Sequence, residues 1–150
     1  MSSMFARETA SLRPALPYPA IVVHGLAQAS AALAEALPVT LLSAPGAASF
    51  AGPGWWRALI VRARAAHPHT PCQDVLDCAD APGHAMAAIR LGQAILVLDP
   101  ACPAFARIAS LATVLPVRPP ALDLAARGAA RRLRAWLTRQ QEDDSRAALR

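Results

Sequence analysis

Five short apolar runs, separated by segments with helical periodicity, constrain what this chain can fold into. The runs are AIVVH (20–24), VTLLS (39–43), DVLDC (74–78), AILVLD (94–99) and TVLPV (113–117). They are continuously apolar rather than alternating, which is typical of strands that are buried on both faces of a sheet. Pro116 cannot donate a backbone hydrogen bond, so the last run belongs at a sheet edge or at a strand end.

The segments between these runs predict helices, because apolar residues recur in them at helical spacing. The first helix is expected to end before Pro38, and Pro53 fits the first turn of the second. We predict that Asp80 is the N-cap of the third helix and that Pro103 opens the fourth. The last helix is expected to run from about residue 122 to residue 141.

This alternation predicts the fold class. The strand starts lie roughly 18–35 residues apart, which leaves room for a helical crossover each time. We therefore expect a single three-layer α/β/α domain with a mainly parallel sheet of about five strands, in a flavodoxin-like or Rossmann-like order. The domain is expected to cover residues 20–141, between a flexible arm (1–19) and a flexible tail (142–150).

Composition excludes several chemistries. Lysine is absent and all 15 basic residues are arginine, which excludes Schiff-base lysine chemistry and a Walker lysine. The chain is alanine-rich, with 37 alanines, which favours closely packed helices. The net charge of +5 comes from five arginines without an acid in residues 124–141. No aromatic or amide group accompanies the stripe of Arg127, Arg131 and Arg134 to read a base, so we interpret it as a solvated helix face and expect no nucleic-acid partner.

The cysteines and the N-terminal segment indicate the compartment. Cys72, Cys78 and Cys102 are odd in number and lack C-x-x-C spacing, which argues against a disulfide framework or a zinc ribbon. The N-terminal segment lacks the apolar core of a signal peptide. The most apolar stretch, 94–117, is interrupted by charged residues and prolines, so we expect no membrane span. The cytoplasm is the expected location.

Polar residues gather where the predicted strands end. In parallel α/β sheets, ligands bind beyond the carboxyl ends of the strands. The candidate ligand-binding residues at these ends are His24, Ser43, Gly46, Asp77, Asp80, Asp99 and Arg118. We expect them to form a crevice for a small anionic ligand, bound by helix N-termini, by the loop around Gly46 and by Arg118. No complete catalytic constellation accompanies them, so the leading hypothesis is a small binding or regulatory module.

A second hypothesis is a small enzyme. If their strands are neighbours, the carboxylates of Asp77, Asp80 and Asp99 would converge and hold a magnesium ion. Capping and turn formation are the competing interpretation of these aspartates. Alternatively, Cys102 at a helix N-terminus would act as a thiolate, against the competing interpretation of a small buried apolar residue.

A third hypothesis is a protein-interaction subunit. Trp55 and Trp56 are adjacent and point about 100° apart on a helix, so only one of them can be well buried. The other tryptophan would line a pocket or cover an interface, either in a homo-oligomer or with another protein.

Overall fold

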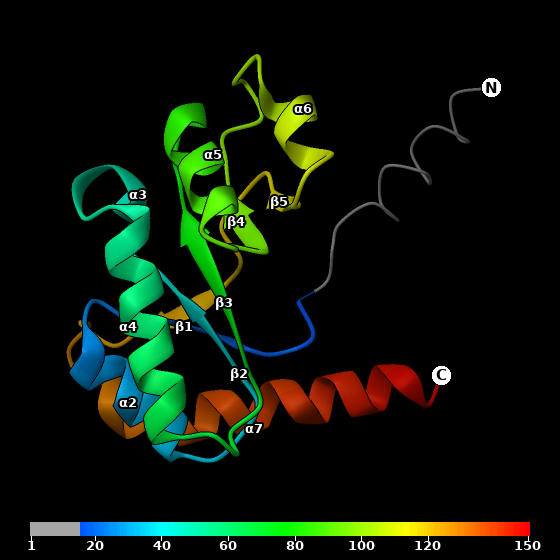
Figure 1. The fold of residues 1–150 in the computed structure, drawn as a ribbon. Helices are drawn as coiled ribbons and strands as arrows, with labels where there is room; N and C mark the ends of the chain where they lie inside the picture. The colour runs from blue at the N-terminus through cyan, green and yellow to red at the C-terminus, as the bar shows by residue number, and fades with distance from the viewer. Residues whose placement is uncertain (1–15) are drawn as a thin grey trace.

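The computed structural model of this protein describes residues 16–150 (Figure 1). Its strands are β1 (Ala20–Val22), β2 (Val39–Leu42), β3 (Cys72–Asp77), β4 (Ile95–Val97), β5 (Thr113–Leu115) and β6 (Ala121–Asp123). Its helices are α2 (Leu26–Ala34), α3 (Ala47–Phe50), α4 (Pro53–Ala66), α5 (Pro82–Arg90), α6 (Phe105–Ala109) and α7 (Ala129–Ala148). Four of the five predicted apolar runs contain a strand, and the third run, 74–78, overlaps β3.

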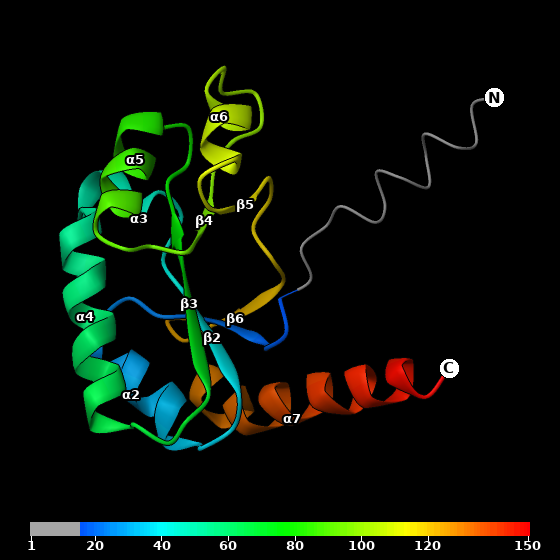
Figure 2. The same ribbon diagram turned by 45° about the vertical axis from the view of Figure 1, so that its right-hand side comes forward.

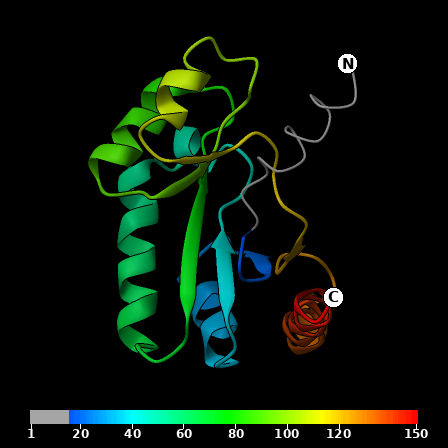
Figure 3. The ribbon, with the colours of Figure 1, turned by 90° about the vertical axis from the view of Figure 1, so that its right-hand side faces the viewer.

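The six strands of the described residues form one parallel sheet with the order β5-β4-β3-β2-β1-β6. The buried side chains of α4, α5 and α7 belong to one hydrophobic cluster, and α7 lies beside α2, where Arg134 is 3.1 Å from Glu35 at the end of α2 (Figures 2 and 3). The predicted class, an α/β domain built on one parallel sheet, is confirmed. The sheet has six strands rather than about five, and β6 is the additional strand.

The strand order differs from both orders expected from the sequence. Strands β1 to β5 follow one another across the sheet, so right-handed crossovers place their connecting helices on a single face. Strand β6 then returns to the free edge of β1, where Leu122 pairs with Ile21. The switch point, where the strand order reverses, therefore lies between β1 and β6. In the flavodoxin-like order it lies between β1 and β3, and in the Rossmann order it lies between β1 and β4.

Alternate strand residues fill two hydrophobic clusters. Leu41, Leu76 and Leu96 belong to the larger cluster, which the long helices cover. Their neighbours along the strands point to the second face, where Val22, Leu42, Val75, Val97 and Leu115 form a smaller cluster. Both clusters are almost completely buried, as expected for strands that are covered on both faces.

The connection between β5 and β6, residues 116–120, crosses the second face of the sheet (Figure 3). It must run from the carboxyl end of β5 to the amino end of β6, because the two strands are parallel and lie at opposite edges. Pro116, Pro119 and Pro120 restrict its backbone and leave it no amide at these positions to pair. We call residues 116–120 the crossing segment.

Three predicted helix starts are wrong. The fourth helix, α6, begins at Phe105 with Ala104 as its N-cap, so Pro103 does not open it. The last helix does not begin near Leu122, because residues 121–123 form β6 and Gly128, with φ of +74°, is the N-cap of α7. The third helix, α5, begins at Pro82 with Ala81 as its N-cap, so Asp80 does not cap it. A helix needs its cap directly before the first turn, and Asp80 lies one residue too early.

The structure describes the last residues of the predicted arm and the predicted tail. Residues 142–148 continue α7, which projects beyond the sheet (Figure 1). Of the predicted arm, residues 1–15 lie outside the described residues. Residues 18 and 19 lie beside β2, where the Tyr18 and Pro19 carbonyls accept hydrogen bonds from Thr40 at 2.8 Å each. Among the described residues, no helix combines the length and the apolar character that a membrane crossing needs.

Candidate functional site

Asp77 is the buried anchor of the carboxyl edge of the sheet. It ends β3, and its side chain is 5% exposed. Its Oδ1 accepts hydrogen bonds from the backbone N–H of Ala79 at 2.8 Å and of Gly46 at 3.1 Å. Its Oδ2 is 2.7 Å from Nη1 of Arg118, which lies on the crossing segment. One carboxylate therefore joins three separate segments of the chain.

Ser43 is buried beside Asp77 and does not face solvent. It is fully buried, and its hydroxyl oxygen accepts a hydrogen bond from the backbone N–H of Asp77 at 2.9 Å. The hydroxyl donates to the carbonyl of Ala44 at 3.1 Å. Both functions of the hydroxyl are thus occupied within the protein, where Ser43 positions the backbone of Asp77.

Two residues with left-handed backbone conformation bring the neighbouring loops to Asp77. Gly46 has φ of +68°, a conformation that glycine adopts without steric cost. Ala79 has φ of +49°, which is uncommon for a residue with a Cβ atom. The N–H of Ala79 donates to Asp77, and its carbonyl accepts from the N–H of Asp99 at 2.7 Å. Backbone strain of this kind is found at functional sites, where the surrounding structure maintains it.

A cavity of about 580 Å³ opens at this edge. Five of the seven residues predicted from the sequence line it: Gly46, Asp77, Asp80, Asp99 and Arg118. The remaining lining residues were not among the predicted ligand contacts, and they are Pro45, Ala79, Val97, Pro100, Pro116 and Val117. The crossing segment thus forms one wall of the cavity, and the ends of β3 and β4 form another. Its acidic and basic side chains are three carboxylates and one guanidinium.

The exposed aspartates of the cavity differ in what they do for the backbone. Asp99 forms a turn, because its Oδ1 accepts a hydrogen bond from the N–H of Ala101 at 2.9 Å, and the predicted turn role is confirmed. Asp80 is exposed, and no hydrogen bond joins its side chain to the described residues. The described residues contain no group of three histidine, cysteine or acidic side chains with metal-binding geometry. Both oxygens of Asp77 are already used, so this arrangement gives the magnesium hypothesis no support.

The thiols give the second enzyme hypothesis no support either. Burial, together with the nearby Asp77 charge, raises the pKa of the Cys78 thiol to about 12, so this group is protonated at neutral pH. Cys102 lies three residues before α6, which has only five residues. A dipole effect large enough to favour a thiolate requires a longer helix that begins at the cysteine.

His24 lies outside the cavity lining and forms a pair of its own. It follows β1, and its Nε2 is 2.8 Å from Oδ1 of Asp123 at the end of β6. Burial raises the pKa of Asp123, but the hydrogen bonds from Ala125 N–H and His24, with the charges of His24 and Arg118, outweigh it. The pKa of Asp123 is therefore lower than usual. One sequence signal for Asp123 is that an acid directly follows two apolar residues.

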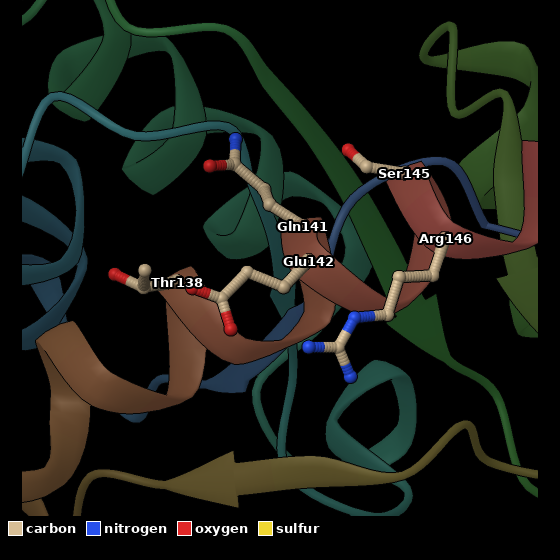
Figure 4. A pocket seen from close by; sticks show the side chains of 5 residues that line it. All are labelled: Thr138, Gln141, Glu142, Ser145 and Arg146. Carbon is tan, nitrogen blue, oxygen red and sulfur yellow. The ribbon is translucent and has the colours of Figure 1, made fainter. Parts of the chain in front are cut away.

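A second pocket lies on α7. Figure 4 shows the side chains that line it, which are Thr138, Gln141, Glu142, Ser145 and Arg146. All five project from one helix, at the spacing of a single helix face. The cavity at the carboxyl edge is the stronger candidate, because groups from four segments of the chain converge there.

The fold and this edge define a small parallel α/β protein with a charged cavity at the carboxyl ends of its strands. No protein-family model matches the chain, and a comparison with curated proteins gave no match.

Proposed function

We propose that this protein is a small binding or regulatory module whose ligand occupies the cavity at the carboxyl ends of β3 and β4. The observation that carries the proposal is the convergence of Asp77, Asp80, Asp99 and Arg118 on one cavity above a buried, fully hydrogen-bonded support. Parallel α/β sheets bind their ligands at this edge. The three free cysteines support a location in the reducing cytoplasm.

The charge of the lining bears on the chemistry of the ligand. An anionic ligand is the expectation from the sequence, but Arg118 is already paired with Asp77, and α3 beside Gly46 is only four residues long. Three carboxylates face one guanidinium in the lining, although the chain as a whole carries +5. This lining favours a small ligand with a cationic group near Asp80 and Asp99 and an oxygen acceptor near Arg118, such as an amine or an amino acid.

A thermal-shift panel tests the proposal. It contains amines, amino acids, magnesium, manganese, phosphate, nucleotides and anionic metabolites. A ligand at one hundred times its dissociation constant stabilises the folded state by about 2.7 kcal/mol. The test variant is D80N/D99N, because asparagine keeps the Oδ1 acceptor that Asp99 uses in its turn. The matched control is E142Q/D143N, which removes two exposed acids from α7.

Each outcome has a defined meaning. We expect an amine or amino acid to stabilise the wild type and the α7 control, and to stabilise the D80N/D99N variant much less. Stabilisation by an anion that is lost in R118Q would instead support the anionic ligand. A magnesium shift that is lost in D80N/D99N would support the enzyme hypothesis. A panel without any shift would contradict a small-molecule ligand.

A second candidate function is protein interaction. Phe50 is 72% exposed and Trp55 is 38% exposed, and they flank the turn between α3 and α4, whereas Trp56 is fully buried. Exposed aromatic residues are enriched at interfaces. Light scattering on the wild type and on W55S tests self-association: a dimer that W55S dissociates supports it, whereas identical monomers contradict it and leave a different protein as the partner.

A further inference from the structure

The pair formed by His24 and Asp123 has the geometry of a base and the group that orients it. The two residues are 99 positions apart in the chain and meet only because β6 pairs with β1. Both side chains remain accessible, with 35% of His24 and 44% of Asp123 exposed. The backbone N–H of His24 donates to Oε1 of Gln28 at 2.8 Å, which fixes the histidine backbone from the first turn of α2.

The contact with Asp123 selects one form of the imidazole. A carboxylate only accepts hydrogen bonds, so Nε2 of His24 must carry a proton to donate to Oδ1. In the neutral ring, Nδ1 then holds the lone pair. No hydrogen bond joins Nδ1 to the residues that the structure describes. Oδ1 of Asp123 also accepts from the Ala125 N–H at 2.9 Å, so the carboxylate is itself held in position.

The pair also lies where this sheet reverses its direction of winding. Strand β1 has β2 on one side and β6 on the other, so the strand order reverses beside β1, and ligands of open α/β sheets bind at such a switch point. The other charged group near the pair is Arg118, whose charge acts on Asp123. Arg118 also lines the cavity, so the cavity and the pair of His24 and Asp123 are adjacent sites.

We propose that His24 is a general base, oriented by Asp123, that removes a proton from a water or hydroxyl group at the junction of β1 and β6. Asp123 is the positioning residue, because it acts through the imidazole. Nδ1 accepts the proton while the oxygen that loses it attacks an electrophilic carbon. The inference rests on this pair alone and does not depend on a ligand in the neighbouring cavity.

Hydrolysis of p-nitrophenyl acetate is the probe reaction. Nδ1 takes a proton from water, the water oxygen bonds to the acyl carbon, and the bond from that carbon to p-nitrophenolate breaks. The imidazolium then releases its proton to solvent, so that one ester and one water give acetate, p-nitrophenolate and two protons. We expect H24Q to remove most of the rate above buffer, and D123A, which removes the acceptor that orients His24, to lower it at least about 10-fold without changing KM.

The other histidines provide matched controls, and a spectroscopic measurement tests the premise directly. H67Q and H84Q are expected to leave the rate unchanged, since neither histidine pairs with a carboxylate among the described residues. Nitrogen-15 NMR is expected to show the Nε2-protonated ring of His24 in the wild type and a mixture of both forms in D123A, which removes the Oδ1 acceptor. Equal contributions from all histidines, or an Nδ1-protonated ring in the wild type, would overturn the proposal.

Discussion

Replacing Arg118 by methionine tests the central contact of the carboxyl edge. The guanidinium lies 2.7 Å from the Asp77 carboxylate, which is almost completely buried. Methionine keeps much of the length of the arginine stem but removes the charge and the donors. Asp77 then retains only the Gly46 and Ala79 amides as partners, and a buried carboxylate is left without its counter-charge.

The expected loss follows from this burial. Removing one partner of a buried ion pair costs about 3–5 kcal/mol, and the partial exposure of Arg118 places R118M near the lower end, about 3 kcal/mol. For a chain of this length that lowers the midpoint of thermal unfolding by about 6–12 °C. Urea unfolding with linear extrapolation measures the free energy directly.

Two further variants decide whether the reasoning holds. D77N/R118M removes both charges while the asparagine Oδ1 still accepts from the two amides, so it is expected to lose only about 1 kcal/mol. R134M breaks the exposed pair with Glu35 and is expected to cost less than about 1 kcal/mol. The argument is refuted if R118M costs no more than R134M, or if the double variant is as unstable as R118M.

Three other predictions concern the surrounding structure. W56F is expected to lose about 2 kcal/mol in urea unfolding, because it removes a buried ring and its hydrogen bond to Asp74 at 3.0 Å, whereas W55F should change stability by less than about 0.5 kcal/mol. A79G is expected to stabilise the protein by about 0.5 kcal/mol, because glycine relieves the strain of the left-handed backbone by more than the extra chain entropy that it loses on folding. An unchanged or lower unfolding midpoint would contradict this. Because burial raises the pKa of Cys78 to about 12, the unfolded thiol ionises before the folded one when the pH is raised. The stability that this thiol contributes below about pH 9 should then fall by roughly 1 kcal/mol per pH unit. When urea unfolding is repeated from pH 8 to 11, the slope should be smaller in C78A, and Cys72, whose pKa burial also raises, contributes to the slope that remains.

Strands β1 to β5 were predictable because a parallel sheet demands continuous apolar runs, and each predicted run overlaps one of these strands. Strand β6 could not be predicted in this way, because its three residues, 121–123, follow two prolines and are too few to show a periodicity. Leu122 also fits the apolar side of an amphipathic helix. The position of β6 depends on β1 having a free edge, which is a property of the whole sheet. The strand order was unpredictable for the same reason.

The candidate site was predictable in part. Asp77, Asp80, Asp99 and Arg118 were found because each follows a strand, and ends of parallel strands share one edge. The pairing of Asp77 with Arg118 needed the path of the crossing segment, which sequence patterns do not contain. The pair of His24 with Asp123 needed the position of β6. Asp80 was misassigned because the helix begins one residue later than the cap rule suggests.

The late placement of β6 has a consequence for how the protein is made. Strand β1 is synthesised first, yet one of its edges pairs only with residues 121–123. While β1 to β5 emerge and assemble, that edge presents unpaired backbone groups, which are a template for association between nascent chains. Completion of the sheet by β6 therefore also closes the surface through which incomplete chains would aggregate.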